Sequence, residues 1–328
     1  MSRVRVFVLL SIGCVLASAV AVTVAVLEAR PGAASSGASA ALATARDADR
    51  SVMVFRSLAS DTRDQIGIVP VGAADDAATL SGMRCERVHF NAGRGLCIAR
   101  GGGFAAGYHA RIFGSDLRVR HELELAGIPS RARVSRDGRV GAVTMFVSGH
   151  SYAAAGAFST QTTLLDLRSG AKIADLETFV VARGQKQVTA VDRNFWGVTF
   201  ARDSDRFYAT MATGGRTYLV EGSVSRRTAR VIHDNVECPS LSPDGRRIAY
   251  KRRTGSSKTT WRLTVLDLDT MRETPLAETR SVDDQAEWLD GDTVLYGRDG
   301  AIWSVPADGT GAPERFIAGA DSPAVVRN

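Results

Sequence analysis

The sequence predicts an all-β fold, a six-bladed β-propeller over residues 51–328 that is closed into a ring by its C-terminal strand. Three observations predict it. A strand–turn–strand pattern occurs five times, its copies lie 41 to 46 residues apart with one longer step, and each end of the region holds part of a sixth unit. Repeats of about 40 to 50 residues with four strands each are typical of propeller blades.

Residues 1–29 have the pattern of an export segment. Arg3 and Arg5 precede an uncharged, mostly apolar run at 6–27, which is about the length of a helix that spans a bilayer. We favour a transmembrane anchor in the cytoplasmic membrane with the two arginines inside. The alternative is a signal peptide cleaved after Ala21. Both predict that the rest of the chain lies outside the cytoplasm, held at the membrane or released as a periplasmic or secreted protein.

Residues 30–50 are rich in Ala, Ser and Gly and contain almost no large apolar residues. A segment of this composition cannot bury enough surface to order itself. The sequence therefore predicts a flexible tether here, with the folded domain starting near Ser51.

The clearest copy of the repeat lies at 238–250, where a polar turn separates two short strands. Proline sets φ for such a turn and glycine supplies a positive φ, while apolar residues alternate along the strand that follows. Weaker copies are found at 90–96, 134–140, 200–207 and 288–294. The residues expected in the repeat turns include Asp137, Gly138, Asp203, Pro243, Asp244, Gly245, Asp290 and Gly291.

The spacing of these turns predicts one blade for each copy. The steps are 45 residues from Gly93 to Gly138, 41 from Asp203 to Asp244 and 46 from Asp244 to Asp290. The step from Asp137 to Asp203 is 66 residues, so we expect an insertion there.

The sixth blade is predicted from the two ends of the domain. Residues 52–55 and 66–72 resemble the later strands of a blade that lacks its first strand, and 322–326 resembles a first strand with nothing after it. If the last strand completes the first blade, the ring closes and no sheet edge is left open at the junction.

The stretch Ser-Pro-Asp-Gly-Arg-Arg-Ile-Ala-Tyr at 242–250 resembles the TolB-type, WD-like β-propeller repeat. The resemblance extends over 51–328, although only this copy is close to the family pattern. It implies an extracytoplasmic interaction scaffold. The α/β domain that precedes the propeller in TolB has no counterpart in the region before residue 51, so the specific envelope role of TolB is not carried over.

Cys85 and Cys97 flank the 91–95 turn almost symmetrically, which brings them near each other across the first hairpin. Outside the cell we expect them to form a disulfide. Cys238 belongs to another blade, and we expect it to be a small core residue.

The insertion at 179–195 contains candidate contact residues, because loops on a rigid scaffold often carry binding function. Arg183, Lys186 and Arg193 with Phe195 and Trp196 would form a cationic, amphipathic surface. The alternative for Phe195 and Trp196 is that they open the next inner strand and pack between blades.

The net charge is +6, with 41 basic and 35 acidic residues, but the basic residues are scattered and no nucleic-acid-binding motif accompanies them. Nucleic acid is therefore an unlikely partner. The histidines are dispersed, and no spacing indicates a catalytic residue, a metal site or a cofactor.

The predicted function is a membrane-anchored, non-catalytic scaffold that binds a protein or an envelope polymer. The alternatives are a propeller enzyme of the lactonase or glycosidase type, or a sensor that binds a solute in the central channel. Either enzyme would need carboxylates or metal ligands converging on that channel.

Overall fold

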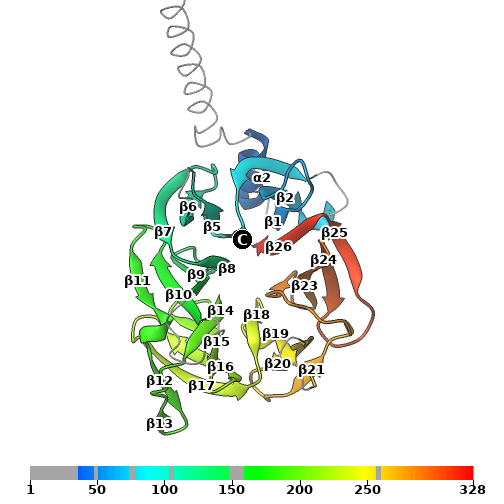
Figure 1. The fold of residues 1–328 in the computed structure, drawn as a ribbon. Coiled ribbons are helices and arrows are strands. Elements are labelled where there is room, and N and C mark those ends of the chain that lie inside the picture. The colour runs from blue at the N-terminus through cyan, green and yellow to red at the C-terminus, as the bar shows by residue number, and fades with distance from the viewer. Residues whose placement is uncertain are drawn as a thin grey trace, which may run out of the picture.

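Six small β-sheets are arranged around a central axis in the computed structural model of the chain (Figure 1). The structure describes residues 36–47, 51–73, 78–102, 107–147, 159–255 and 260–327. Colour runs around the ring in chain order, from blue beside α2 to red at β26. The predicted all-β six-bladed propeller is confirmed.

The first three blades each contain four strands. From the axis outward, their strands are β26 (Ala320–Val326), β1 (Val52–Ser57), β2 (Gln65–Pro70) and β3 (Thr79–Arg84) in blade 1; β4 (Arg87–Asn91), β5 (Arg94–Arg100), β6 (Tyr108–Gly114) and β7 (Val119–Leu125) in blade 2; and β8 (Ile128–Val134), β9 (Val140–Val147), β10 (Ser159–Asp166) and β11 (Lys172–Asp175) in blade 3.

Blade 4 has six strands, and blades 5 and 6 have four each. Their strands are β14 (Asn194–Phe200), β15 (Arg206–Thr213), β16 (Arg216–Ser223), β17 (Thr228–Asp234), β12 (Val180–Arg183) and β13 (Lys186–Gln187) in blade 4; β18 (Glu237–Leu241), β19 (Arg247–Arg253), β20 (Trp261–Asp267) and β21 (Glu273–Pro275) in blade 5; and β22 (Glu287–Trp288), β23 (Thr293–Arg298), β24 (Ala301–Pro306) and β25 (Glu314–Ala318) in blade 6.

The ring closes as predicted. The C-terminal strand β26 pairs antiparallel with β1, with Val52 opposite Val326 and Ser57 opposite Ala320. Strands from the two ends of the domain therefore share one sheet, and the inner edge of β1 is covered rather than left unpaired.

The insertion that accounts for the 66-residue step from Asp137 to Asp203 extends blade 4 outward. Strand β12 pairs parallel to β17, and the two-residue strand β13 continues the sheet beyond it. In Figure 1 this hairpin projects from the rim of the ring. Two short 3-10 helices, η1 (Val71–Ala73) and η2 (Leu176–Thr178), complete the described connections.

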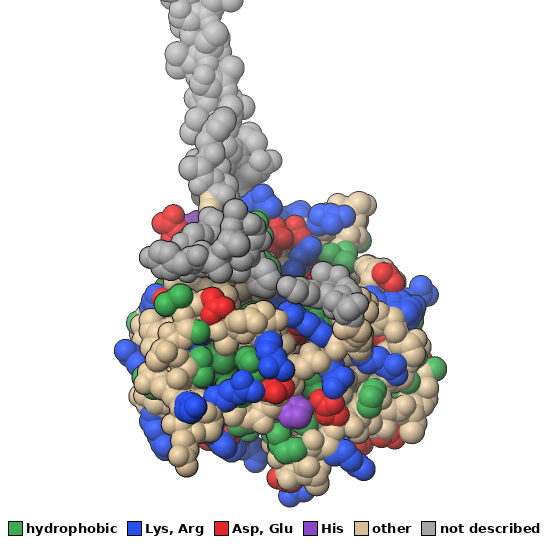
Figure 2. Space-filling view, turned by 60° about the horizontal axis from the view of Figure 1, so that its bottom comes forward, with side chains coloured by type: hydrophobic (Ala, Val, Ile, Leu, Met, Phe, Trp, Pro, Cys, Tyr) green, Lys and Arg blue, Asp and Glu red, His purple; other side chains and the backbone are tan. Residues whose placement is uncertain are grey.

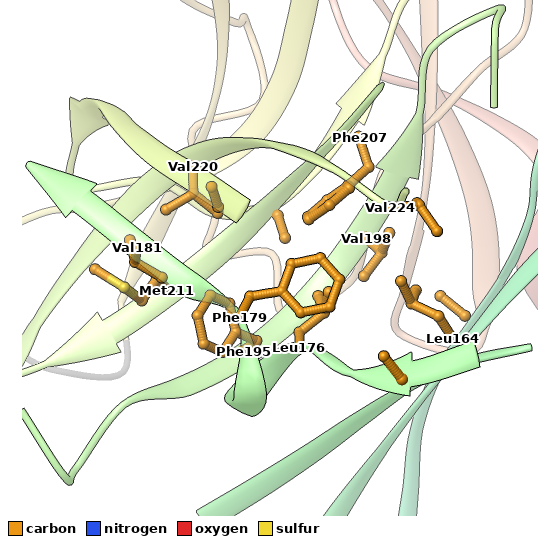
Figure 3. Packing of buried hydrophobic residues seen from close by; sticks show 14 of the residues in the cluster. Leu164, Leu176, Phe179, Val181, Phe195, Val198, Phe207, Met211, Val220 and Val224 are labelled. Atoms are coloured by element: carbon orange, nitrogen blue, oxygen red, sulfur yellow. The ribbon is translucent and has the colours of Figure 1, made fainter. Parts of the chain in front are cut away.

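Hydrophobic side chains fill the spaces between neighbouring blades. Figure 3 shows the cluster between blades 3 and 4, where Leu164 and Leu176 meet Phe179, Phe195 and Phe207. The rings of Phe179 and Phe207 pack edge to face with centroids 5.9 Å apart. Because each blade is too thin to bury its own faces, this packing is what holds the ring together.

A glycine beneath a phenylalanine ring recurs within the blades. Gly95 lies opposite Phe113, and an added Cβ would come within 2.0 Å of that ring. Gly67 under Phe55 is arranged in the same way, with 2.3 Å to the ring. The glycines leave room for large rings on strongly twisted strands.

Part of the predicted tether forms a helix. Residues 36–47 make up helix α2 (Ser36–Asp47), whose Ala38 and Leu42 are buried in the core of blades 1 and 2. The two side chains are four residues apart and so share one helix face. The alanine content that argued against a core instead favours a helix once this small apolar face has a sheet to pack on.

No helix in the described part of the chain is long and apolar enough to cross a membrane. The predicted anchor at 6–27 lies outside the described residues.

Candidate ligand site at the central channel

The six innermost strands surround the axis and end at one hollow. The hollow has a volume of about 340 Å³, and every blade contributes to its lining. We call it the channel mouth. Its lining includes His89 from β4, Arg133 from β8, Thr199 from β14, Ser240 from β18, Glu287 from β22, and Arg327 just beyond β26.

A buried ion pair forms the floor of the channel mouth. Nη1 of Arg133 donates a hydrogen bond to Oε2 of Glu287, and Nη2 donates to the carbonyl of Ala286 at 3.2 Å. Arg133 is 7% exposed and Glu287 is 5% exposed. The Nε of Arg133 has no hydrogen-bond partner within the described structure.

His89 lies beside this pair as a neutral imidazole. The backbone N–H of Val134 donates to Nδ1 of His89 at 3.2 Å. Nε2 of the same ring lies 3.0 Å from Nη1 of Arg133 and 3.9 Å from Oε2 of Glu287. Burial lowers the pKa of His89, in agreement with a neutral ring.

Glu287 remains ionised at the centre of the molecule. Burial by itself would raise its pKa, but the guanidinium of Arg133, the nearby ring of His89 and the charge of Arg327 outweigh burial and hold the pKa at about 2. A carboxylate held in this way is unsuited to exchange protons near neutral pH. The floor of the mouth is therefore a buried pair of fixed charges rather than an acid–base site.

Four further arginines surround the hollow above this floor. Arg136 donates to the carbonyl of Pro243 at 2.7 Å, and Arg327 pairs with Oε1 of Glu287 at 3.5 Å. Arg206 lies 3.8 Å from Glu221, while the exposed Arg202 makes no hydrogen bond or ion pair with any described residue.

The charge of the channel mouth is strongly positive. Its lining contains five arginines against the two carboxylates Asp244 and Glu287, which gives +5 − 2 = +3 with His89 neutral. Burial, followed by repulsion from Arg202 and Arg327, lowers the pKa of Arg136. Guanidinium groups that repel one another across a hollow would be stabilised by an anion between them, and arginine binds carboxylate and phosphate oxygens through paired N–H groups.

The opposite end of the channel has mixed charge. There, at the start of the innermost strands, Arg87 and Arg131 lie near Asp283 and Asp321. Asp283 binds Nζ of Lys251 at 2.5 Å, and Arg87 donates to the carbonyl of Ser130 at 2.7 Å. The positive excess is therefore a property of one end of the channel.

The prediction that Phe195 and Trp196 belong to an exposed contact surface around 179–195 is wrong. Phe195 is 1% exposed and Trp196 is 6% exposed. Both lie on β14, and Phe195 packs between blades 3 and 4 (Figure 3). They open an inner strand, which was the alternative interpretation, because the insertion ends before residue 194 rather than including it.

The three basic residues of that segment do not converge. Arg183 stacks over Tyr218 at 4.8 Å and lies 3.6 Å from Asp234, while Lys186 is exposed on β13. Arg193 donates to the carbonyl of Val188 at 2.9 Å and so stabilises the insertion itself.

The predicted disulfide is confirmed. Cys85 and Cys97 are bonded, with their Cα atoms 5.4 Å apart. They join the residues before β4 to β5 within the core of blades 1 and 2. Cys238 is a free, buried thiol, as expected.

The aspartates of the repeat turns hold their own turns. Asp137 accepts from the N–H of Arg139 at 3.0 Å, and Asp244 accepts from Arg246 at the same distance. Asp203 and Asp290 likewise accept from backbone N–H groups two and three residues on. Within the described residues, no group of three or more His, Cys, Asp or Glu side chains is placed to hold a metal ion.

Sequence reasoning missed the residues of the channel mouth, although the repeat holds a signal for them. The residue before the last apolar position of each innermost strand is polar in five copies: His89, Arg133, Thr199, Ser240 and Glu287. Because side chains alternate along a strand, this position faces the axis when its neighbour packs between blades.

No protein-family model and no curated protein sequence matches the chain. In three dimensions it is similar to TolB from Acinetobacter baumannii, with a TM-score of 0.56 and 16% identity, over 84% of this chain and 66% of that one. A putative TolB from Agrobacterium tumefaciens gives a TM-score of 0.51 and 13% identity, over 83% and 91%.

A puromycin-hydrolyzing peptidase from Mycobacterium tuberculosis is also similar, with a TM-score of 0.50 and 14% identity, over 78% of this chain and 42% of that one. The chain thus spans just under two thirds of the Acinetobacter protein and less than half of the peptidase. At such low identity the likeness concerns the fold. The chain has the fold of a TolB-type six-bladed β-propeller.

Proposed function

We propose that the chain is a non-catalytic scaffold that binds an anionic partner at the channel mouth. The observation that carries this proposal is the excess of arginine around a hollow to which all six blades contribute. Arg202 has no described partner, and Arg136 is repelled by its neighbours. Both are therefore available to bind carboxylate or phosphate groups.

The partner in this proposal is an acidic protein segment or an anionic envelope polymer. Nucleic acid fits less well, because stacking of single-stranded bases would need exposed aromatic side chains, and Phe200 in the lining of the mouth is buried. On the face drawn in Figure 2, the basic side chains of the described residues are scattered among acidic ones rather than joined into a stripe.

In this proposal the propeller works outside the cytoplasm, held at the membrane by residues 6–27. The Cys85–Cys97 disulfide supports an oxidising compartment. The basic start and apolar run of the N-terminus support export. The TolB-type fold agrees with such a location.

A propeller enzyme is the alternative function. The fold alone permits it, since a peptidase is among the similar structures. The described part of the channel argues for binding instead, because Glu287 is committed to Arg133 and the carboxylates of the repeat turns are committed to backbone N–H groups.

Capture from envelope extract tests the proposal. The bait is the full chain in detergent, compared with the variant Arg136→Gln/Arg202→Gln. The matched control is Arg63→Gln/Arg216→Gln, which removes two exposed charges from the other face. We expect one saturable anionic partner that the wild type and the control retain and the mouth variant loses. Equal capture by all three proteins would contradict the proposal.

A further inference from the structure

A second basic hollow lies on the same face as the channel mouth. It has a volume of about 760 Å³ and is lined by turns of blades 2 and 3. We call it the outer hollow. Its charged residues are the three arginines Arg94, Arg120 and Arg168 and the single carboxylate Asp116, an excess of two positive charges.

Not all of these charges are already engaged. Arg120 pairs with Asp116 at 2.7 Å, and Arg94 donates to the carbonyl of Gly138 at 3.4 Å. The exposed guanidinium of Arg168 makes no hydrogen bond or ion pair with any described residue. The backbone carbonyl of Arg168 accepts a hydrogen bond from His121 at 2.9 Å. A free charge therefore lies in each hollow, Arg202 in the mouth and Arg168 in the outer hollow.

The two hollows are separated only by two touching turns. Asn91 lines the channel mouth, and its neighbour Ala92 lines the outer hollow. The turn that holds them packs on the β8–β9 turn, where a Cβ on Gly138 would lie 3.2 Å from the carbonyl oxygens of both residues. Arg136, two residues before Gly138, lines the mouth. A ligand that leaves the mouth over this ridge enters the outer hollow directly.

The arginines of both hollows favour a ligand with closely spaced negative charges. The apolar residues under the outer hollow, Ile112, Phe113 and Leu167, are at most 2% exposed. A chain of phosphoryl groups carries a negative charge at every unit, and arginine matches phosphate geometry.

We propose that the ligand is a linear phosphate-containing polyanion that fills the channel mouth and extends over the β4–β5 turn into the outer hollow. This inference rests on the proposed function and names the ligand class of the same site. Linking two weak sites through one ligand makes the second contact intramolecular, so affinity rises with ligand length.

Titration of the full chain with inorganic polyphosphates tests this inference. Tripolyphosphate is the short probe that reports on the channel mouth, and a long polyphosphate is the probe that reaches both hollows. Arg168→Gln is compared with Arg216→Gln, an exposed arginine on the other face whose loss changes net charge equally. Calorimetry at fixed ionic strength gives the affinities.

We expect the long chain to bind about a hundredfold more tightly than tripolyphosphate. Arg168→Gln should remove most of that gain and leave tripolyphosphate binding unchanged, and Arg216→Gln should alter neither. Failure of tripolyphosphate to bind would overturn the proposed function together with this inference.

Two other results would overturn the inference alone. One is tripolyphosphate binding that depends on Arg202 with no gain for the long chain. The other is a poly-glutamate of matched charge that shows the same gain and the same loss in Arg168→Gln, because the selectivity would then be for charge and not for phosphoryl groups.

Discussion

Arg133 and Glu287 lie 154 residues apart in the sequence and meet at the axis of the molecule. Both are almost fully buried, and further hydrogen bonds to Ala286 and Ser240 hold the guanidinium. A buried ion pair contributes little to stability as a pair, but removing one partner leaves an uncompensated charge. The pair therefore fixes how blades 3 and 6 face each other across the channel.

Glu287→Gln should lower the free energy of unfolding by about 3 to 5 kcal/mol, because it leaves Arg133 buried without its counter-ion. Urea denaturation measures this. Glu124→Gln, which removes an exposed carboxylate on β7, is the control and should change stability by less than about 0.5 kcal/mol. Equal midpoints for the two variants would show that Arg133 does not depend on Glu287 as its counter-ion.

Glu177 should make the free energy of unfolding decrease as pH rises, because its pKa is raised in the folded protein. Burial raises its pKa to about 8, although the N–H of Thr162 donates to both carboxylate oxygens at 3.0 and 3.1 Å. Its stabilising effect is then complete below the ordinary glutamate pKa and is lost as pH rises towards 8, by at most about 1.4 kcal/mol per pH unit.

Denaturation of the wild type and Glu177→Gln between pH 5 and 8 checks this. The glutamine resembles the protonated carboxyl, so the variant should lose less stability than the wild type as pH rises. Parallel pH profiles would show that Glu177 is ionised throughout this range.

At the residue scale, the sequence allowed the prediction of groups whose partners are local. Cys85 and Cys97 flank one turn, and Asp137 and Asp244 bind their own turns, so spacing was enough. Arg133 occupies a polar position that recurs in the innermost strands, but its pairing with Glu287 was not predictable, since that partner belongs to a blade on the other side of the ring.

At the scale of elements, the disulfide stabilises the hairpin that starts blade 2. Its cysteines are 12 residues apart, and closing a loop of this length is worth about 3 kcal/mol in the chain-entropy model. Cys85→Ser/Cys97→Ser should lose about that much stability. Reductant should lower the wild type to the level of the variant and leave the variant unchanged. A variant as stable as the oxidised wild type would contradict this account.

Because Gly95 pairs with Phe113, adding a single methyl group at position 95 should clearly lower the free energy of unfolding. Gly95→Ala would place Cβ within 2.0 Å of the Phe113 ring, which is 1% exposed and cannot move outward freely. We expect a loss of about 1 to 3 kcal/mol, measured by denaturation. Gly72→Ala meets nothing within 4 Å and is the matched control. If the two variants lost the same stability, the close approach of Phe113 to Gly95 would have no effect on the free energy of unfolding.

Elements that follow the strand–turn–strand repeat were predicted from the sequence, and elements outside this repeat were not. The turns near Gly138 and Gly245 gave the inner hairpins of blades 3 and 5. Helix α2 was missed because Ala38 and Leu42 form a small apolar face that becomes a core contact only against a finished blade. The β12–β17 pairing was missed because it joins strands more than forty residues apart in parallel.

At the scale of the whole molecule, closure by β26 was predictable because both ends of the domain held half of one unit. The same closure brings Arg327, at the very end of the described chain, to the axis beside Glu287. The positive channel mouth therefore exists only in the closed ring, since no single blade carries more than two of its arginines.

The affinity of the full chain for pyrophosphate tests the central claim, that the channel mouth is an anion site, most directly. Calorimetric titration compares the wild type with Arg136→Gln/Arg202→Gln and with the control Arg63→Gln/Arg216→Gln. The account predicts binding that the mouth variant loses by about a hundredfold, roughly 1.4 kcal/mol for each charge-assisted contact, and that the control retains. Equal affinity in all three proteins, or no binding by the wild type at low ionic strength, would contradict it.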